Sequence, residues 1–483
     1  MAARHETILE SGEWDAGKQD GILSASKAHN AAQWCMETMR PSVLTRVGPK
    51  RQIRRTAYLD GLRGFAAFLV YWQHHQLWPR PGGDAIFENA FGYQNKYYFA
   101  CLPVIRTFFT GGHFAVAVFF IISGYVLSTK PLTLIHSGEY SKLGDNLASA
   151  LFRRWLRLHL PVIVVSFLYM TTWHAFGIWT VAPEHKLTYS EEVWNFYLEF
   201  KNFSFAFRQG GEAWFTYNFP TWSIPVEFRG SIIVYTALLA FSRCTKNARL
   251  LGQLVLIFYF MYIVDGWYGA MFITGMLLCE LDILARTNEL PRFIARLQPH
   301  KTMIFYSLFA ISAFLSGVPS HTNNVEVLRE SPGWYYLSFL KSQAVWDLKW
   351  FYLFWAALFL VVSIPRIGWL RAFFENRFNQ YLGRISFALY LVHGPVLWTV
   401  GDRLYTAAGW HRDSHLTFLP GWVDIFLLSK EGPLGFELSF LLPHLVILPL
   451  TFWLAEVATK LIDEPSVRFS QWLYEKILPQ QSQ

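Results

Sequence analysis

Ten apolar stretches of bilayer length are the feature that most constrains how this chain can fold. They lie near residues 58–77, 113–128, 159–179, 222–241, 250–264, 267–285, 302–317, 350–365, 385–400 and 437–460. A helix that crosses a membrane needs roughly 20 mainly apolar residues, because each residue advances the helix by only about 1.5 Å. The chain is 53% hydrophobic and 18% aromatic, as expected for many spans with aromatic side chains at the membrane surfaces. The sequence therefore predicts an all-α, polytopic integral membrane protein with about ten transmembrane helices.

The spacing of these stretches leaves no room for a separate soluble domain. We expect one membrane domain over residues 55–470, preceded by a polar cytosolic tail (1–54) and followed by a short tail (471–483). The N-terminal tail is polar and mixed in charge, a composition typical of disorder. It does not have the pattern of a cleavable signal peptide, so the first apolar helix is expected to act as the targeting signal.

The distribution of lysine and arginine predicts the orientation. With the N-terminus in the cytosol, the inner loops hold 16 of these residues, whereas the longer outer loops hold 12. Cytosolic loops are usually the more basic ones. We therefore expect both termini in the cytosol and a location in the endoplasmic reticulum or another endomembrane. The net charge of +8 is accounted for by these loops, so the expected partner is the lipid bilayer and not a nucleic acid.

Two ionisable residues, Arg63 and His74, stand eleven positions apart in the first apolar stretch. At about 100° per residue, eleven steps make three turns plus roughly 20°, so both side chains lie on one face of the helix. They are separated by about 16 Å along its axis. Ionisable groups inside a membrane are costly and usually mark function. This face of the first helix is therefore the first candidate for a functional site.

Five further motifs follow in a fixed order. They read GGHFAVAVFFIISGYVLS (111–128), FRRWLRLHLP (152–161), PTWSIPVEFRGS (220–231), ISFALYLVHGPV (385–396) and LIDEPS (461–466). Together with the preceding arginine–ten–histidine pattern, the chain resembles the membrane-bound acyltransferase-3 family, and its motifs look most like those of fungal members. The resemblance covers about residues 55–470.

The resemblance implies an O-acyltransferase that moves an acyl group, often acetyl, from acyl-coenzyme A to a hydroxyl. It places the essential histidine at His74, and a histidine is suited to remove the proton of a weak alcohol nucleophile. The alternative is a hydrogen-bonded core histidine. Its neighbour His75 is rotated by about 100° and is expected to point elsewhere. Arg63 could stabilise an oxyanion or hold a coenzyme phosphate, or could pair with Asp60 one turn earlier.

Three arginines, Arg153, Arg154 and Arg157, stand at the expected cytosolic mouth of the third span. Their forked donors suit phosphates, and coenzyme A carries a diphosphate and a ribose phosphate. The resemblance implies that this segment meets the coenzyme. Ordinary anchoring of a cytosolic loop explains the same arginines without any ligand.

The tryptophan–serine–glutamate motif of the family corresponds to Trp222, Ser223 and Glu227. The resemblance implies that Trp222 and Ser223 bind substrate or coenzyme and that Glu227 takes part in catalysis. Ser223 and Glu227 are four apart and share a helical face. Glu227 could orient His74 or pair with an arginine, and Arg229 is the nearest candidate in sequence.

Two other residues have open interpretations. His393 lies in the ninth stretch and is either part of the substrate cavity, as the resemblance implies, or a core histidine. Ser123 and Gly124 are small residues, which usually serve close approach between membrane helices.

The expected reactants follow from the resemblance. Acyl-coenzyme A, normally acetyl-coenzyme A, is the expected co-substrate, and no bound cofactor is expected. No metal is expected either, because the four cysteines have no metal-ligand spacing. The expected acceptor is a hydroxyl of a small fungal secondary metabolite. Acetylation of a polysaccharide or lipid is the alternative acceptor class, and a membrane carrier without catalysis is the alternative function, since ionisable groups also line transport paths.

Overall fold

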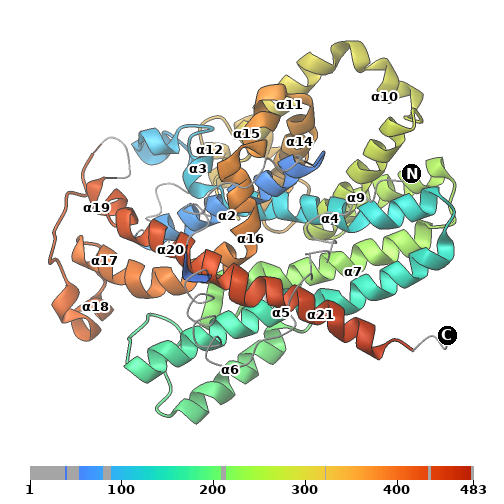
Figure 1. Ribbon diagram of the computed structural model, residues 1–483. Coiled ribbons are helices and arrows are strands. Elements are labelled where there is room, and N and C mark those ends of the chain that lie inside the picture. Colours follow the sequence, from blue (N-terminus) through green and yellow to red (C-terminus); the bar gives the residue numbers. More distant parts are fainter. Residues whose placement is uncertain are drawn as a thin grey trace.

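The protein is all-helical throughout the part of the chain that the computed structural model describes, residues 38–40, 54–79, 89–207, 214–320, 323–432 and 437–479 (Figure 1). The long helices are α2 (Ala57–Leu77), α4 (Gly112–His136), α5 (Tyr140–Phe176), α6 (Tyr189–Phe203), α7 (Ser223–Phe241), α8 (Lys246–Phe258), α9 (Trp267–Arg286), α11 (Lys301–Leu315), α14 (Leu348–Ser363), α16 (Arg377–Val396), α20 (His444–Ala458) and α21 (Glu464–Ile477). The short helices are α3 (Thr107–Thr110), α10 (Arg292–Arg296), α12 (Val325–Glu330), α13 (Tyr335–Ser338), α15 (Gly368–Glu375), α17 (Asp402–Ala407), α18 (Asp413–Phe418) and α19 (Leu438–Leu441).

Six helical segments of the described chain are long and apolar enough to cross a membrane. They are Gly112–His136, Tyr140–Phe176, Thr216–Phe241, Trp267–Arg286, Leu348–Arg366 and Leu438–Ile477. Every one of the ten expected stretches overlaps a helix, but those near 58–77, 250–264, 302–317 and 385–400 fall on α2, α8, α11 and α16, which are not among the six. The all-helical fold is thus confirmed, whereas the count of about ten spans is not. With 13 and 15 residues, α8 and α11 are by themselves shorter than a bilayer requires, although α8 continues directly into a π-helical turn (Tyr259–Ile263).

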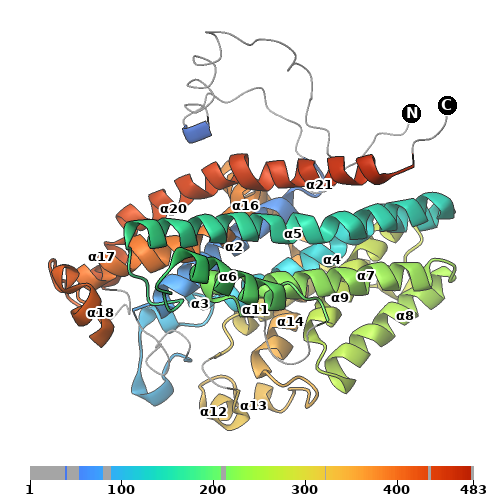
Figure 2. The ribbon, with the colours of Figure 1, turned by 90° about the horizontal axis from the view of Figure 1, so that it is seen from below.

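Two helical segments, α5 and Leu438–Ile477, extend well beyond the thickness of a membrane. The 37 residues of α5 make a helix about 55 Å long, against a hydrocarbon core of about 30 Å. Figure 2 shows α5 running beside α20 and α21, and α5 packs directly against α21. Because α21 continues to Ile477, the beginning of the expected C-terminal tail (471–483) is helical. The expected N-terminal tail lies outside the described residues apart from 38–40 and Arg54.

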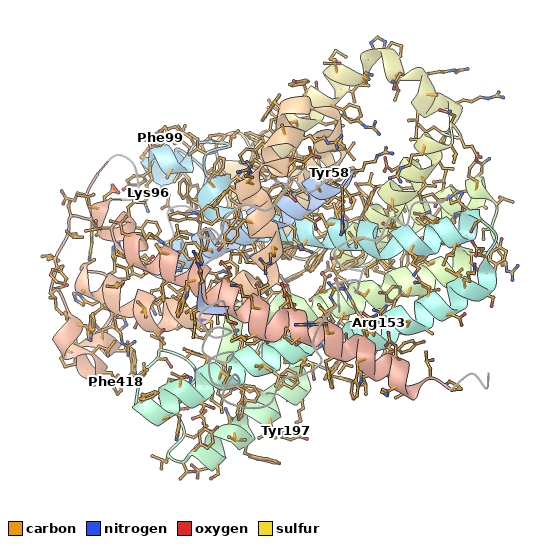
Figure 3. The ribbon with its side chains drawn as sticks, in the orientation of Figure 1. Tyr58, Lys96, Phe99, Arg153, Tyr197 and Phe418 are labelled. Carbon is orange, nitrogen blue, oxygen red and sulfur yellow. The ribbon has the colours of Figure 1, made fainter. Side chains whose placement is uncertain are left out.

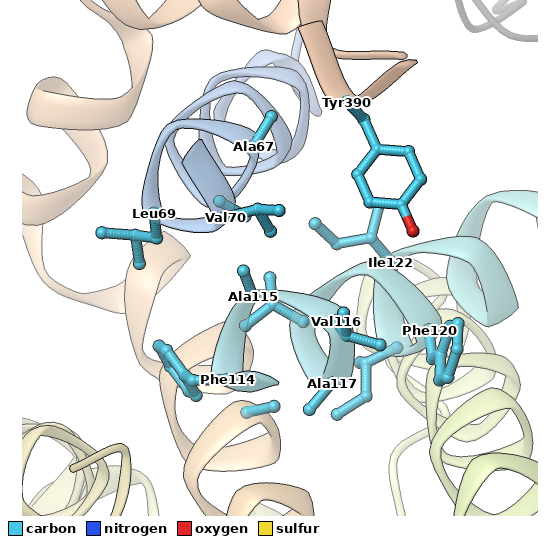
Figure 4. Packing of buried hydrophobic residues seen from close by; sticks show 14 of the residues in the cluster. Ala67, Leu69, Val70, Phe114, Ala115, Val116, Ala117, Phe120, Ile122 and Tyr390 are labelled. Atoms are coloured by element: carbon cyan, nitrogen blue, oxygen red, sulfur yellow. The ribbon is translucent and has the colours of Figure 1, made fainter. Parts of the chain in front are cut away.

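The centre of the fold is built by α2, α4, α9 and α16, and small residues let α2 approach α16 closely and α4 approach α9 closely. A Cβ atom on Gly64 of α2 would lie 2.2 Å from the backbone nitrogen of Gly383 on α16. A Cβ on Gly124 of α4 would lie 2.0 Å from the carbonyl oxygen of Phe272 on α9. The close packing expected at Gly124 is therefore present, and Figure 4 shows the apolar side chains that fill the space between α2 and α4. These crossings hold the polar side chains described next in a rigid frame.

Candidate active site

Arg63 is anchored to a helix that lies more than 300 residues away in the sequence. Its Nε donates to Ser386 Oγ at 3.0 Å, and its Nη2 donates to the carbonyl oxygen of Gly383 at 2.8 Å. The expected partner on its own helix, Asp60, is farther away, with Oδ1 3.9 Å from Nη2. Arg63 therefore forms a local ion pair and also links α2 to α16. It lines the pocket described below as well.

A pocket opens between α2, α4, α5, α7 and α16, next to a π-helical turn (Thr459–Asp463) that joins α20 to α21. Its polar wall holds Arg63, Arg154, Arg157, Arg384, Glu227, Asp463, Ser123, Ser223, Ser386 and Tyr390, and its apolar wall holds Phe119, Phe120, Ile122, Leu158, Ile224 and Phe387. Four guanidinium groups face two carboxylates, so positive charge is in excess when all six are ionised. Such a pocket is suited to an anion that also carries an apolar portion.

The three arginines of α5 have different surroundings. Arg154 and Arg157 line the pocket, but Arg153 does not. Arg153 Nε bonds back to Ser149 of its own helix, 3.2 Å from the carbonyl oxygen and 3.1 Å from Oγ. Figure 3 shows Arg153 on the stretch of α5 that runs beside α21. Arg153, the first of the three arginines, therefore lies outside the pocket lining, whereas its neighbour Arg154 belongs to it.

Glu227 bridges three helices. Its Oε1 accepts from Ser123 Oγ of α4 at 2.6 Å and from Arg154 Nη2 of α5 at 2.5 Å. Arg154 Nε in turn donates to Ser231 Oγ on α7 at 2.8 Å. The arginine partner of Glu227 is therefore Arg154 and not Arg229, which points to another side of α7. Ser123 does more than allow close packing, because it supplies a hydrogen bond to the carboxylate.

His74 lies beside His393 and not beside Glu227. Its Nδ1 is 3.0 Å from the carbonyl oxygen of Val70, one turn earlier in α2, and 3.2 Å from Nε2 of His393 on α16. His393 is held in the same manner, with its Nδ1 3.1 Å from the carbonyl oxygen of Leu389. His393 is 1% exposed, while His74 is only half-buried. His74 is therefore the more exposed residue of the pair.

His75 belongs to a different cluster, as its rotation around α2 predicted. Its Nδ1 is 3.0 Å from the hydroxyl of Tyr405, whose oxygen is also 3.0 Å from Nε2 of His444. The other nitrogen of His444 is 2.8 Å from the hydroxyl of Tyr71. His75 is fully buried in this network. Across the described residues, no group of three or more histidine, cysteine, aspartate or glutamate side chains is arranged to hold a metal ion.

Ser223 and Tyr390 connect the pocket to the histidine pair. Both line the pocket, and their hydroxyl oxygens are 2.8 Å apart. Tyr390 is three residues before His393 on α16, and the two ring centres are 5.9 Å apart. Trp222 is buried outside the pocket lining, with its ring 5.9 Å from that of Trp350. Of the expected tryptophan–serine–glutamate motif, the serine and the glutamate reach the pocket and the tryptophan packs behind them.

Four polar residues of the pocket were not singled out from the sequence: Arg384, Ser386, Tyr390 and Asp463. Ser386 and Tyr390 are four apart in the more apolar half of α16, and that spacing on one face is a signal that could have been used. Asp463 lies within the LIDEPS motif (461–466), which marked this segment but not the carboxylate itself. It ends the π-helical turn Thr459–Asp463, which changes the helical register, and turns of this kind often occur at functional sites.

Comparisons with known proteins place this geometry in context. Residues 56–429 match a family model described as an acyltransferase domain. The chain is 29% identical to the O-acetyltransferase PaAT-1 of Phomopsis amygdali, over 94% of this chain and 91% of the relative. It is also 23% identical to the acyltransferase clz18 of Cochliobolus lunatus, over 74% of this chain and 86% of the relative, and 24% identical to the acyltransferase R4 of a Phoma species, over 73% and 85%. No solved structure matches the chain.

Proposed function

The chain belongs to the acyltransferase domain family that its residues 56–429 match, and from this premise we propose that it is a membrane-bound O-acyltransferase that uses acyl-coenzyme A. The acyl group we propose is acetyl, and the acceptor is a hydroxyl of a small molecule. Support for the O-acetyl specificity comes from PaAT-1, which is named an O-acetyltransferase and aligns with almost the whole chain.

The observation that carries this proposal is the arginine-lined pocket, whose Tyr390 lies beside the His74–His393 pair. Guanidinium groups form forked hydrogen bonds with phosphates, and coenzyme A offers a diphosphate and a ribose phosphate. In the proposal, Arg157, Arg384 and Arg63 face these phosphates, while Arg154 is engaged mainly by Glu227. The distance of about 16 Å between Arg63 and His74 along α2 is of the same order as the extended pantetheine arm. The thioester would then pass Tyr390 and reach the histidines.

The proposed chemical step is direct transfer. His74 Nε2 removes the proton of the acceptor hydroxyl as its oxygen attacks the thioester carbonyl carbon. The tetrahedral intermediate collapses, the carbon–sulfur bond breaks, and the coenzyme thiolate takes the proton back from His74. The products are an ester and free coenzyme A, so atoms and charges balance. The Tyr390 hydroxyl would stabilise the oxyanion only by giving up the hydrogen bond that it donates to the carbonyl oxygen of Pro220.

The proposed orientation places the donor in the cytosol. Arg63 lies near the start of α2, and we propose that this end and both termini face the cytosol of an endomembrane such as the endoplasmic reticulum. Coenzyme A would then enter the pocket from the side on which it is made. The acceptor proposed here is a fungal secondary metabolite, and its support is that the three acyltransferases named above come from fungi.

One assay with two readouts tests the function. Detergent-purified protein is incubated with radiolabelled acetyl-coenzyme A and a panel of hydroxyl compounds, including terpenoids, polyketides, a lipid and an oligosaccharide. We expect label transfer to a small apolar alcohol and a rise in the melting temperature with acetyl-coenzyme A. Absence of both transfer and coenzyme binding would contradict the proposal and would favour a carrier. Transfer to the oligosaccharide alone would retain the enzyme class and change the acceptor.

A further inference from the structure

The hydrogen bonds around His74 and His393 determine which ring nitrogens carry protons. The Nδ1 atoms of both rings face backbone carbonyl oxygens, those of Val70 and Leu389, at 3.0 and 3.1 Å. A carbonyl oxygen only accepts hydrogen bonds, so each Nδ1 must be the protonated nitrogen of its neutral ring. His393 Nε2 is then unprotonated, and its lone pair faces His74 Nδ1, which is 3.2 Å away. The Nδ1–H of His74 is shared between two acceptors, and His74 Nε2 is left as the basic nitrogen.

The segment that carries His393 is held rigidly by a buried asparagine. Pro395 has no N–H and cannot donate to the carbonyl oxygen of Leu391, four residues earlier. Asn218 Nδ2 donates to that oxygen instead, at 2.9 Å, and Asn218 is fully buried. A Cβ on Gly394 would lie 3.0 Å from Asn218 Oδ1, so the two segments are in close contact. The His393 ring therefore has little freedom to move away from its partner.

The other end of the same helix is fixed to α2. Arg63 bonds Gly383 and Ser386 of α16, and Gly64 packs against the backbone of Gly383. The helices α2 and α16, which carry His74 and His393, are thus fixed to each other at two places along their length. Such a frame can hold a pair of imidazoles in one relative orientation through a catalytic cycle.

We propose that His393 is a positioning residue for His74. It accepts the Nδ1–H of His74, selects the tautomer whose Nε2 is basic, and stabilises the imidazolium while His74 holds the acceptor's proton. This inference rests on the proposed function. The arrangement has the logic of a histidine oriented by a carboxylate, with a neutral imidazole in place of the charge. A neutral acceptor favours the same tautomer, but it stabilises the imidazolium less than a carboxylate does.

Two matched variants test the role. The terminal amide of glutamine reaches about the position of histidine Nε2, whereas that of asparagine reaches only the position of Nδ1. His393→Gln keeps an acceptor for His74, while His393→Asn keeps only the bond to Leu389. We expect His393→Asn to lower kcat by about 10- to 100-fold with both KM values unchanged, the range seen when a partner that orients a metal-ligating histidine is lost. His393→Gln should retain most of the turnover.

A second measurement does not depend on activity. Nitrogen-15 spectra of histidine-labelled protein report the tautomer of each ring, and the His74 signal is identified by its loss in His74→Ala. We expect the Nδ1–H form of His74 in the wild type and in His393→Gln, and a mixture of tautomers in His393→Asn. Unchanged spectra and unchanged kcat in His393→Asn would overturn the inference. Full activity of His74→Ala would instead overturn the proposal that His74 is the base. If the protein shows no transfer activity, the spectra alone still test whether His393 sets the tautomer of His74.

Discussion

Arg154 Nη2 lies 2.5 Å from Glu227 Oε1, and this ion pair joins α5 to α7 where the two side chains are only 11% and 12% exposed. Ser123 donates to the same carboxylate oxygen from α4. A pair of this kind adds little net stability, because desolvation offsets attraction, but removal of one partner leaves an unpaired buried charge. The contact therefore couples the shape of the pocket to the integrity of the helix packing.

Removing one partner of this pair should destabilise the protein more than removing both. Glu227→Leu leaves the Arg154 guanidinium buried without its carboxylate, and we expect a loss of about 3–5 kcal/mol. The double variant Glu227→Leu/Arg154→Met should recover most of it. Apparent melting temperatures of the two single variants and the double variant in one detergent measure this. Strictly additive losses would show that the two side chains are not coupled.

Loss of the pocket arginines should weaken donor binding. If Arg157 and Arg384 contact coenzyme phosphates, each alanine variant loses charge-assisted hydrogen bonds of about 1.5–3 kcal/mol. The KM for acetyl-coenzyme A should then rise by about 10- to 100-fold with little change in kcat. Arg153→Ala is the control, because Arg153 is outside the pocket lining, and it should raise KM clearly less. A fall in kcat with an unchanged donor KM, or equal effects at all three positions, would argue against the assignment.

Variants of the two adjacent histidines should fail in different ways. His74→Ala should lower kcat by about 10²- to 10⁴-fold, the usual contribution of a positioned base, with a normal melting temperature. His75→Ala should mainly lower the melting temperature, because it removes the partner of the Tyr405 hydroxyl and leaves a cavity. Turnover and thermal unfolding are measured on the same preparations. Near-normal turnover in His74→Ala with loss in His75→Ala would mean that the base is the second histidine.

The crossing of α4 and α9 should not tolerate a side chain. The Cβ of alanine at Gly124 would lie 2.0 Å from the carbonyl oxygen of Phe272, so the helices must separate. We expect Gly124→Ala to cost about 1–3 kcal/mol. Gly144→Ala is the control, because nothing lies within 4 Å of its Cβ on α5, and it should be neutral or stabilising. Equal melting temperatures for the two variants would contradict the close crossing.

Glycosylation mapping tests the proposed orientation. An acceptor sequon introduced at residue 290 should remain unmodified, because this loop is expected in the cytosol. A sequon in the loop near residues 401–432 should be modified in the lumen. A gel shift that is reversed by a glycosidase reports each site. Modification at 290 would reverse the orientation and move the proposed donor entrance to the other side of the membrane.

The positions of the helices were largely predictable from the sequence. Each apolar stretch overlaps a helix, because burial of backbone polar groups in lipid leaves almost no alternative to helical hydrogen bonding. The ends were less predictable. The stretch at 159–179 marks only the apolar half of α5 (Tyr140–Phe176), since hydropathy reports contact with lipid and not the end of a helix.

The placement of Arg63 and His74 on one face of α2 also follows from the sequence, because helical periodicity relates residues that are close along the chain. Their partners do not. Ser386 and His393 are more than 300 residues away, and only the crossing of α2 with α16 brings them into contact. Periodicity likewise gives Arg153 and Arg157 one face, and only the depth of the pocket separates them. Local pattern thus determined which side chains share a helical face, whereas the packing of distant helices decided which of them meet, because contact depends on the shapes of both surfaces.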